Sequence, residues 1–559
     1  MKIKILGGGQ VSLSKRDFVG SGGEGSVYVR GSTAYKIYAN PKKMIPEQKI
    51  EELSKIRNKN VIKPLNVLLD SRNKPVGYSM RFVKDASPIC QLFTKAYKKR
   101  NGIGPDDVFG IVRDMQDGLE GIHSADVLVV DLNEMNLLLK GSDVFWIDVD
   151  SYQTKSYPAT AIMDSIRDWQ AKSWTRETDW FSWGIVTFQL FTGIHPFKGK
   201  HPSVKKMADR MLQNLSVFND DVKVPKMVPS FETIPEAYRR WYKAVFEDGR
   251  RVPPPKGLGL GVVFVAPRNI SSTDRLKISE VFGLERNIFR YDRIDGFDLI
   301  AMDGSVVCLT KDRGTPFSIQ GDGCFGHTSD QDPLYGRREG GEAYLVNAKT
   351  LLPVGQRAPC QSMMAYDGRF YIHYDENVIE LMIRKVGNNT QVFPHPVANV
   401  MPMATQLFDG VAIQNMLGSW YASVFPGSQM CNQVRLKELD GYRIVDAKHD
   451  HRVMIVIGTK NGQYDKFVYR FERDYVNAIL FWKDEDVAYS GINFVTLDKG
   501  VCAHIDEVED LVLFGATPTV DGVKRISDPM IGGDMRLFKR GNEVLFARGS
   551  QLFKLSMRN

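Results

Sequence analysis

The sequence predicts two domains of different fold class, an α+β domain over residues 1–255 and an all-β domain over residues 256–559. Apolar residues recur at helical spacing in the first part, and these long stripes fade in the second. The run at 252–259 contains three prolines and two glycines, which stop a helix and release the chain. After this run, Asp-Gly pairs alternate with short apolar stretches, a pattern that is typical of β-hairpins.

The composition is that of an ordinary globular protein. Of the 559 residues, 43% are hydrophobic and 25% are charged, which excludes wholesale disorder, collagen and coiled-coil rods. The net charge of +8 is spread over many residues and does not by itself indicate nucleic-acid binding. The most apolar stretch, Trp183–Phe191, has about half the ~20 residues that a bilayer crossing needs. The six cysteines are scattered and the N-terminus has no secretory signal, so we expect a cytoplasmic protein without membrane or nucleic-acid partners.

The first motif is a glycine-rich turn between two strand-like segments. Gly20, Gly22, Gly25 and Val27 form the pattern G-x-G-x-x-G-x-V. Such a turn lets backbone N–H groups approach phosphates, although glycines also occupy plain hairpins. Lys36 follows inside an apolar strand, where its charge needs a partner or solvent. Its place after a glycine-rich turn makes this lysine a candidate for binding phosphates.

Acidic residues follow at the ends of apolar segments. Apolar spacing predicts helices over 46–57 and 108–123, and a third helix that is entered through an acidic cap at Asp179. Asp131 and Asn136 lie five residues apart, so that a carboxylate can accept a proton and an amide oxygen can bind a metal. Asp148 ends the next apolar strand, and hard oxygen ligands of this kind suit Mg²⁺.

In this order and spacing, the motifs between about residue 10 and residue 255 resemble the protein kinase fold, with one lobe over 1–80 and a second over 84–255. The resemblance implies that Asp131 is the catalytic-loop aspartate, that Asn136 and Asp148 bind magnesium, and that Asp179 braces the catalytic loop. It implies that the glycine-rich turn and Lys36 hold the phosphates of ATP. The residues that it places around the adenine are Val27, Ala34, the gatekeeper Met80 and the hinge residues Arg81 to Val83.

Several positions depart from the kinase pattern. Val129 and Val130 replace the His-Arg pair before the catalytic aspartate, and Asn133 replaces a phosphate-stabilising lysine. Asp150 stands where the glycine of DFG belongs, and we interpret it as a cap on the following turn rather than as a second metal ligand. No Ala-Pro-Glu motif is visible before Asp179, which leaves the platform for a peptide substrate and the substrate class open.

The resemblance implies that the acidic partner of Lys36 comes from the helix predicted over 46–57. Its apolar stripe turns Lys49 to the position where the resemblance requires a glutamate, so a shift of the helix is needed. We predict Glu47 as the partner, with Glu51 as the alternative. Farther on, the basic run Lys95 to Arg100 is interpreted as a solvated face.

The motifs around Asp131 and Asp148 also resemble an atypical bacterial subgroup with the patterns GDLNxxN and IDxDSxQ, and bacteriophages carry kinase-like proteins as well. In the second domain, similar hairpins recur near residues 367, 409 and 450, and a period of about 40–45 residues matches one blade of a β-propeller. We predict six or seven blades, with a β-sandwich or two small β domains as alternatives. Strands are expected at Gly261–Val265, Phe297–Met302, Ser305–Thr310, Arg369–Tyr374, Val378–Ile383, Val453–Ile457, Phe467–Phe471, Leu511–Phe514, Glu543–Ala547 and Gln551–Leu555.

These observations predict an ATP- and Mg²⁺-dependent phosphotransferase, a Ser/Thr protein kinase whose β domain recruits a protein substrate or partner. The alternative is a nucleotide-binding pseudokinase that acts as a scaffold through its propeller, which Val130, Asn133 and the absent Ala-Pro-Glu motif favour. Transfer of another part of ATP, such as AMP, or phosphorylation of a small molecule is a third possibility. Intact base and metal positions favour the first.

Overall fold

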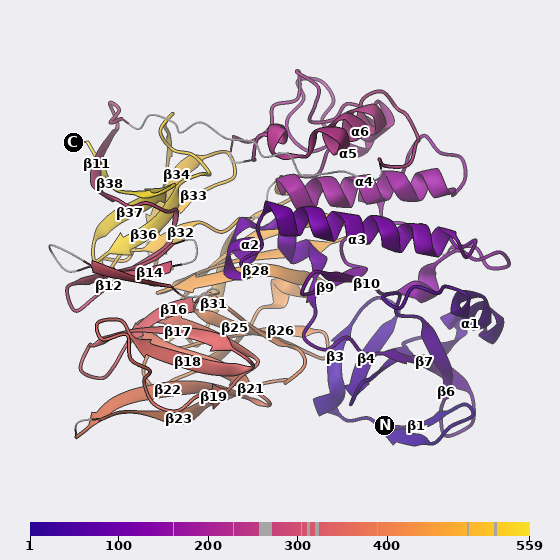
Figure 1. Ribbon diagram of the computed structural model, residues 1–559, viewed down its shortest axis with the longest axis horizontal. Helices are drawn as coiled ribbons and strands as arrows, with labels where there is room; N and C mark the ends of the chain where they lie inside the picture. Colours follow the sequence, from indigo (N-terminus) through magenta and orange to yellow (C-terminus); the bar gives the residue numbers. More distant parts are fainter. Residues whose placement is uncertain are drawn as a thin grey trace.

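The computed structural model contains an N-terminal region, residues 1–255, and a C-terminal β region, residues 271–558, which lie side by side (Figure 1). The structure describes residues 1–558 apart from 160, 227, 256–270, 303–304, 310–313, 319–322, 388, 489–490 and 519–521. The strand predicted at Gly261–Val265 and the Asp-Gly pair at 303–304 lie outside the described residues. The exact domain boundary stays a prediction, since half of the run at 252–259 lies there too.

An antiparallel sheet of seven strands forms the first part of the N-terminal region, in the order β2-β1-β6-β7-β5-β4-β3. Glycine lets two of these strands lie close together, because a Cβ on Gly77 would lie 1.9 Å from the carbonyl oxygen of Lys36. Helix α1 (Glu47–Ser54) packs Ile50 against the sheet. The strands are β1 (Lys2–Ile5), β2 (Gln10–Ser12), β3 (Phe18–Ser21), β4 (Gly25–Arg30), β5 (Thr33–Tyr38), β6 (Pro64–Leu69) and β7 (Pro75–Arg81).

Two long helices, α3 (Pro105–His123) and α4 (Arg176–Thr192), form the centre of the second part and pack against each other (Figure 1). The predicted apolar stripe of α3 is buried, and α4 is buried along nearly its whole length. The predicted acidic cap of α4 is wrong, because the Thr175 side chain accepts the N–H of Thr178 at the helix start. The other elements are α2 (Lys95–Arg100), α5 (Met207–Leu212), α6 (Glu236–Phe246), β8 (Ser87–Pro88), β9 (Leu137–Lys140) and β10 (Asp143–Trp146). In the described part of the chain, no helix has the length and apolarity to cross a membrane.

The described part of the β region contains seven four-stranded antiparallel sheets. Six of them are formed by consecutive strands, and the seventh combines β11 with β36–β38, so that the first and last strands of the region pair. The first three sheets contain β11 (Leu276–Gly283), β12 (Ile288–Ile294), β13 (Phe297–Met302), β14 (Ser305–Leu309), β15 (Gly314–Ser318), β16 (Gly323–His327), β17 (Pro333–Glu339), β18 (Glu342–Asn347), β19 (Ala358–Pro359), β36 (Arg536–Arg540), β37 (Glu543–Arg548) and β38 (Gln551–Met557). The other four contain β20 (Ser362–Tyr366), β21 (Arg369–Tyr374), β22 (Asn377–Val386), β23 (Asn389–Asn399), β24 (Thr405–Phe408), β25 (Val411–Met416), β26 (Ser419–Val424), β27 (Asn432–Arg435), β28 (Arg443–Asp450), β29 (Val453–Lys460), β30 (Gln463–Phe471), β31 (Ala478–Asp484), β32 (Phe494–Thr496), β33 (Val501–Ile505), β34 (Asp510–Gly515) and β35 (Val523–Ser527).

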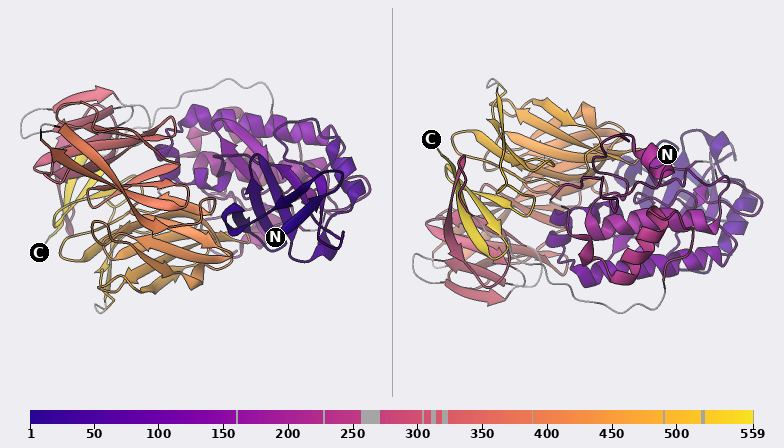
Figure 2. Two further views of the ribbon diagram at one scale, coloured as in Figure 1. Left: turned by 90° about the horizontal axis from the view of Figure 1, so that it is seen from below. Right: turned by 90° about the horizontal axis from the view of Figure 1, so that it is seen from above.

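Neighbouring sheets meet at one terminal strand of each, in the order β32, β36, β12, β16, β20, β24, β28. Hydrogen bonds join β28 to β32: Lys448 donates to the carbonyl of Phe494 at 2.8 Å, and Thr496 donates to the carbonyl of Asp450 at 3.0 Å. Figure 2 shows these sheets on one side of the molecule and the helices on the other.

The described strands predicted for the β region are present, with ends that differ by up to a few residues. The hairpins near residues 367, 409 and 450 all join the first two strands of successive sheets, so the predicted repeat corresponds to a structural repeat. Asp295 and Gly296 both have positive φ between β12 and β13, as a type I′ turn requires. Asp440-Gly441 is one of the Asp-Gly pairs that the sequence pattern assigns to hairpins, and here that assignment is wrong, because the pair follows a short 3₁₀ helix and precedes β28.

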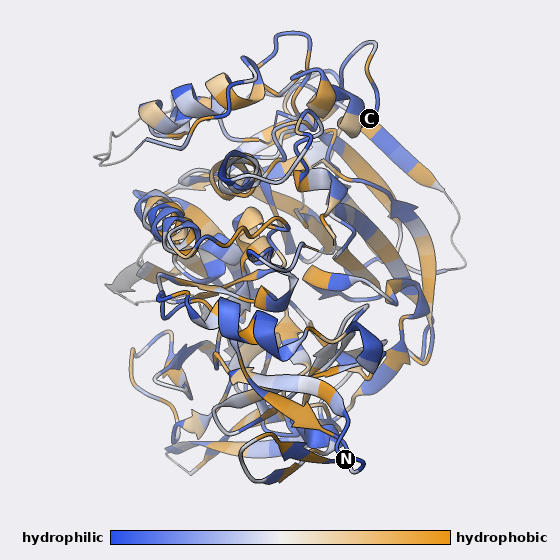
Figure 3. Cartoon of the chain, turned by 90° about the vertical axis from the view of Figure 1, so that its right-hand side faces the viewer, coloured by the Kyte–Doolittle hydropathy of each residue, from blue (hydrophilic) through white to orange (hydrophobic). Residues whose placement is uncertain are grey.

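A few hydrophobic residues of the β region belong to the main core of the N-terminal region. Hydrophobic and hydrophilic residues alternate along many strands of the chain (Figure 3). The largest buried cluster contains side chains of α3 and α4 together with Val445, Ile457, Tyr464 and Val487 of the β region. The β region is therefore packed firmly onto the N-terminal region.

Candidate active site

The glycine-rich turn joins β3 to β4, and no other described residue packs against its first two glycines on the side where a Cβ would lie. A Cβ built on Gly20 or Gly22 would meet no described atom within 4 Å, whereas one on Gly25 would lie 2.1 Å from the carbonyl oxygen of Ile37. Gly25 is therefore required for the packing of β4 on β5. Gly20 and Gly22 leave the backbone accessible, as the binding of phosphates requires.

Lys36 lies on β5 at the centre of a cluster of carboxylates. Its Nζ is 2.8 Å from Asp148 Oδ1, 2.7 Å from Asp150 Oδ2 and 3.1 Å from Glu24 Oε2. Burial opposes the charge of Lys36, but Asp150 and Asp148 outweigh burial and raise the pKa of this ammonium above its usual value. Burial and the neighbouring Asp150 raise the pKa of Asp148. The cluster thus joins the glycine-rich turn to Asp148.

The predicted pairing of Lys36 with Glu47 is wrong. Glu47 and Glu51 are exposed on α1, and the same helix turns Lys49 inward together with Ile50. Among the described residues, the buried partner of Lys36 is Asp150. Lys49 donates to the backbone carbonyl of Asp150 at 2.7 Å, so no shift of the helix is needed.

The sequence led us to expect that Asp150 caps the following turn, and this expectation is wrong. Its carboxylate accepts hydrogen bonds from Lys36, from the Tyr78 hydroxyl at 2.6 Å and from the Tyr38 hydroxyl. Burial works against its ionisation, yet Lys36 and these hydrogen bonds lower the pKa of Asp150. Sequence reasoning missed Tyr38, Tyr78 and Glu24. The only signal was that Asp150 follows Asp148 closely.

Asp131 and Asn136 lie on a loop that leads into β9. The Asn136 side-chain amide donates to the Asp131 carbonyl at 3.1 Å and lies 3.4 Å from Asp131 Oδ2. Asp131 Oδ1 accepts the backbone N–H of Met163 at 2.8 Å. Burial raises the pKa of Asp131, and the hydrogen bond from Met163 partly opposes this shift. The Asn136 carbonyl accepts the N–H of Ile147 at 3.0 Å, which ties this loop to the residue before Asp148.

Asp179 lies in the first turn of α4 and is completely buried. Its carboxylate accepts the backbone N–H groups of Val129 and Val130, each at 2.8 Å, and lies 2.8 Å from the His123 ring. Val130 has a φ of 62°, a conformation that β-branched residues rarely adopt. Asp179 thus holds the backbone just before Asp131, in the position that the resemblance implies.

Oxygen donors for a metal ion lie between the glycine-rich turn and the catalytic loop. Carboxylate oxygens of Glu24, Asp148 and Asp150 lie within 4.8 Å of one another, with the Lys36 ammonium among them. Asp148 and the amide oxygen of Asn136 are hard ligands of the kind that Mg²⁺ prefers. The chemistry of these oxygen donors suits a hard divalent cation.

The predicted adenine-contacting residues share one part of the sheet. Val27 pairs with Lys36 across β4 and β5, and Ala34 pairs with Met80 across β5 and β7. Arg81 ends β7, and the half-buried Val83 follows in the connection to the second lobe. Strand register therefore brings the predicted residues to neighbouring positions.

The segment between Asp150 and α4, residues 151–175, is here called the activation segment. Near its end, Asp168 accepts two hydrogen bonds from the Arg251 guanidinium, at 2.6 and 2.9 Å. Asp168 is buried and anchors the segment to the end of the N-terminal region. Sequence reasoning missed this pair. Only the motif Ala-Pro-Glu was sought in this region, and the residues around Asp168 do not match that motif.

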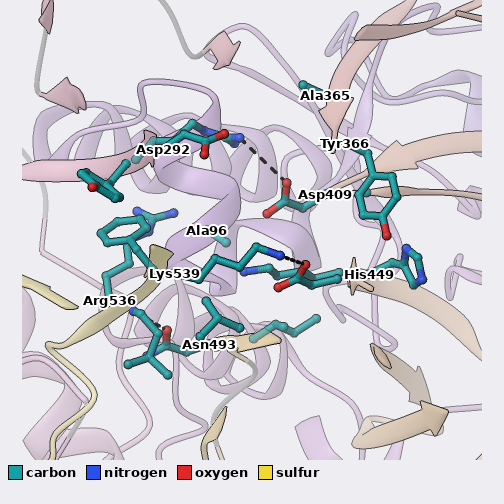
Figure 4. A pocket seen from close by; sticks show the side chains of 18 of the residues that line it. Ala96, Asp292, Ala365, Tyr366, Asp409, His449, Asn493, Arg536 and Lys539 are labelled. Atoms are coloured by element: carbon teal, nitrogen blue, oxygen red, sulfur yellow. Dashed lines mark hydrogen bonds and ion pairs between the residues drawn. The ribbon is translucent and has the colours of Figure 1, made fainter. Parts of the chain in front are cut away.

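A separate cavity of about 910 Å³ lies between α2 and the β region, lined by residues such as Asp292, Asp409 and Lys539 (Figure 4). Charges of both signs line it, and Lys539 pairs with Asp450 at 2.7 Å. Burial raises the pKa of Asp292 to about 6.

The basic run Lys95 to Arg100, which forms α2, is not simply a solvated face, because Arg100 pairs with Asp446 of the β region at 3.1 Å.

Two comparisons with known proteins bear on the site. Residues 13–248 match the family model of the protein kinase domain. The chain is 31% identical over 116 residues to a serine/threonine/tyrosine-protein kinase of Arabidopsis thaliana, HT1, a match that covers 19% of this chain and 29% of that protein. The chain thus matches less than a third of the length of this curated relative. Both findings support similarity of the N-terminal region to protein kinases, whereas the bacterial subgroup stays a prediction.

Proposed function

We propose that this chain transfers the γ-phosphoryl group of ATP to the hydroxyl of a serine or threonine in another protein. The observation that carries the proposal is a pair of linked contact sets. Lys36 contacts Glu24 and Asp148, and Ile147, the residue before Asp148, donates to the carbonyl of Asn136, which in turn contacts Asp131. These contacts join a phosphate-binding cation, oxygen ligands for a metal and a general base. Similarity to protein kinases supports this assignment of roles.

In the proposed reaction, the acceptor hydroxyl oxygen forms a bond to the γ-phosphorus while the bond to the β–γ bridging oxygen breaks, and ADP leaves. Asp131 orients the hydroxyl and takes its proton. Lys36 and the backbone of the glycine-rich turn hold the phosphates so that attacking and leaving oxygens lie in line. Asp148 and Asn136 would hold Mg²⁺, which neutralises the charge that develops on the phosphates.

The β region would recruit the protein substrate or a partner. We propose that its seven sheets are the blades of a propeller, supported by the contacts from β32 through β28 and by the pairing of β11 with β38. We also propose a cytoplasmic location, because the six cysteines are free thiols, as in proteins of a reducing compartment.

The proposal is tested with γ-labelled ATP, Mg²⁺ and generic protein substrates, with Asp131→Ala and Asp148→Asn beside the wild type. We expect the wild type to transfer label and Asp131→Ala to lose about 100- to 10,000-fold in rate, the usual contribution of a general base. Asp148→Asn should lose magnesium-dependent transfer. Asp143→Asn is the matched control, because Asp143 is exposed at the start of the strand that leads to Asp148.

Nucleotide binding without transfer by the wild type would contradict the proposal and favour a scaffold. A parallel reaction with α-labelled ATP separates phosphoryl transfer from transfer of AMP, since only AMP transfer moves the α label to the acceptor.

A further inference from the structure

One hairpin of the β region reaches the activation segment. Asn461 and Gly462 form the turn between β29 and β30, with φ values of 52° and 72°. A Cβ on Gly462 would lie 2.1 Å from Ser165 Oγ, 2.9 Å from Ser165 Cβ and 2.8 Å from Met163 Sδ. The turn therefore touches the activation segment so closely that only glycine fits.

The same hairpin contacts the catalytic loop. The Tyr464 hydroxyl, on β30, donates to Glu134 Oε1 at 2.7 Å, and both side chains are buried. Arg443, at the start of β28, donates to the carbonyl of Met135 at 3.0 Å. Glu134 and Met135 lie between Asp131 and Asn136, so the β region contacts the loop that carries both predicted site residues.

The contacted residues connect directly to the general base. Met163, which Gly462 touches, donates its backbone N–H to Asp131 Oδ1 at 2.8 Å. Ser165, the other contact of Gly462, is held by a further hydrogen bond, because its carbonyl lies 2.7 Å from Nε2 of the buried His195. Displacement of Ser165 by the turn would therefore be passed to Met163 and to the carboxylate of Asp131.

We propose that Gly462 and Tyr464 are positioning residues for phosphoryl transfer: the β29–β30 hairpin fixes the activation segment and the catalytic loop, and thereby orients Asp131. This inference rests on the proposed function. It assigns to the β region a part in catalysis besides recruitment. The hairpin would also anchor the activation segment. In protein kinases an arginine at the position of Val130 holds a phosphorylated segment, and this chain has valine there.

The test compares Gly462→Ala with Gly296→Ala in the full chain. Both glycines lie in type I′ turns, with φ values of 72° and 77°, but a Cβ on Gly296 would meet no described atom within 4 Å. Both variants therefore carry the same backbone strain, and only Gly462→Ala displaces the activation segment. We expect Gly462→Ala to lower kcat about 10- to 100-fold, as displacements near 1 Å do, with the KM for ATP unchanged. Ser165→Gly combined with Gly462→Ala should restore kcat toward the value of Ser165→Gly alone.

Tyr464→Phe provides a second variant that keeps the packing of the ring, with Tyr469→Phe on the same strand as its control, because the Tyr469 hydroxyl faces Glu438 instead. We expect kcat to fall only in Tyr464→Phe. Equal kcat values within each pair would overturn the inference. Absence of transfer by the wild type would overturn the proposed function instead. Amide hydrogen exchange over residues 161–168 then tests the structural part of the inference, that the hairpin fixes the activation segment: faster exchange in Gly462→Ala than in Gly296→Ala supports it, and equal exchange overturns it.

Discussion

Asp150 supplies the buried negative charge that lies beside the ammonium groups of Lys36 and Lys49. It lies two residues after Asp148, is buried, and accepts hydrogen bonds from Lys36 and from two tyrosine hydroxyls. Its backbone carbonyl also receives the Lys49 ammonium, the pKa of which is lowered by burial. Buried charges are tolerated only when they are paired, so the inward Lys49 and the extra acidic residue belong to one arrangement.

We predict that Asp150→Asn destabilises the protein by about 2 to 4 kcal/mol, because it leaves the buried Lys36 and Lys49 ammonium groups with less negative charge. Glu47→Gln on exposed α1 should change the free energy of unfolding by less than about 0.5 kcal/mol. Chemical denaturation of the two variants and of the wild type measures both values. A larger loss in Glu47→Gln than in Asp150→Asn would restore Glu47 as the partner of Lys36.

Through the resemblance to protein kinases, the motifs predicted that Lys36, Asp131, Asn136 and Asp148 share one site. The structure places Lys36 beside Asp148 and Asn136 beside Asp131. The partner of Lys36 could not be predicted in the same way. The apolar stripe of α1 correctly turned Lys49 inward, but a buried lysine is credible only beside a buried carboxylate. That carboxylate, Asp150, lies 101 residues farther along the chain and has no local signature.

At the scale of elements, the short segment that follows α4 supports the activation segment through one neutral histidine. His195 Nε2 lies 2.7 Å from the Ser165 carbonyl, and Nδ1 accepts the N–H of Phe197 at 3.1 Å. Only the neutral ring with its proton on Nε2 satisfies both bonds. Burial lowers the pKa of His195 to about 3, from the 6.5 of an exposed histidine.

We predict that acid destabilises the fold through His195. Below about pH 6.5 the unfolded chain binds a proton at this residue and the folded chain does not, so stability falls by about 1.4 kcal/mol per pH unit until about pH 3. His195→Gln, which can make both hydrogen bonds without titrating, should show a curve of stability against pH that is shallower by this slope. Groups with raised pKa, such as Asp292, act in the opposite direction but are present in both proteins. Parallel curves between about pH 4 and 6 would contradict the prediction.

At the scale of the whole molecule, the two regions are joined by a shared core rather than by surface contacts. Val445, Ile457 and Val487 of the β region are buried among side chains of the helices, whereas the ion pair between Arg16 and Glu376 is largely exposed. The sequence allowed the strands and hairpins to be predicted, because their signals are local. It did not distinguish the Asn461-Gly462 turn, which docks on the activation segment, from Asp295-Gly296, which faces open space, since docking depends on the partner surface.

We predict that residues 1–255 alone are much less stable than the same region in the full chain. The fragment lacks four side chains of the β region that are buried in this core, and its helices would expose the apolar surface that these side chains cover. At about 1.5 kcal/mol for each side chain, the free energy of unfolding should fall by roughly 6 kcal/mol. Calorimetry should show a lower melting temperature and a stronger tendency to aggregate for the fragment. Arg16→Ala in the full chain is the control, because an exposed ion pair contributes about 0–1 kcal/mol and its loss should leave the melting temperature nearly unchanged. A fragment that melts at the temperature of the full chain would mean that the shared core contributes nothing to the stability of the N-terminal region.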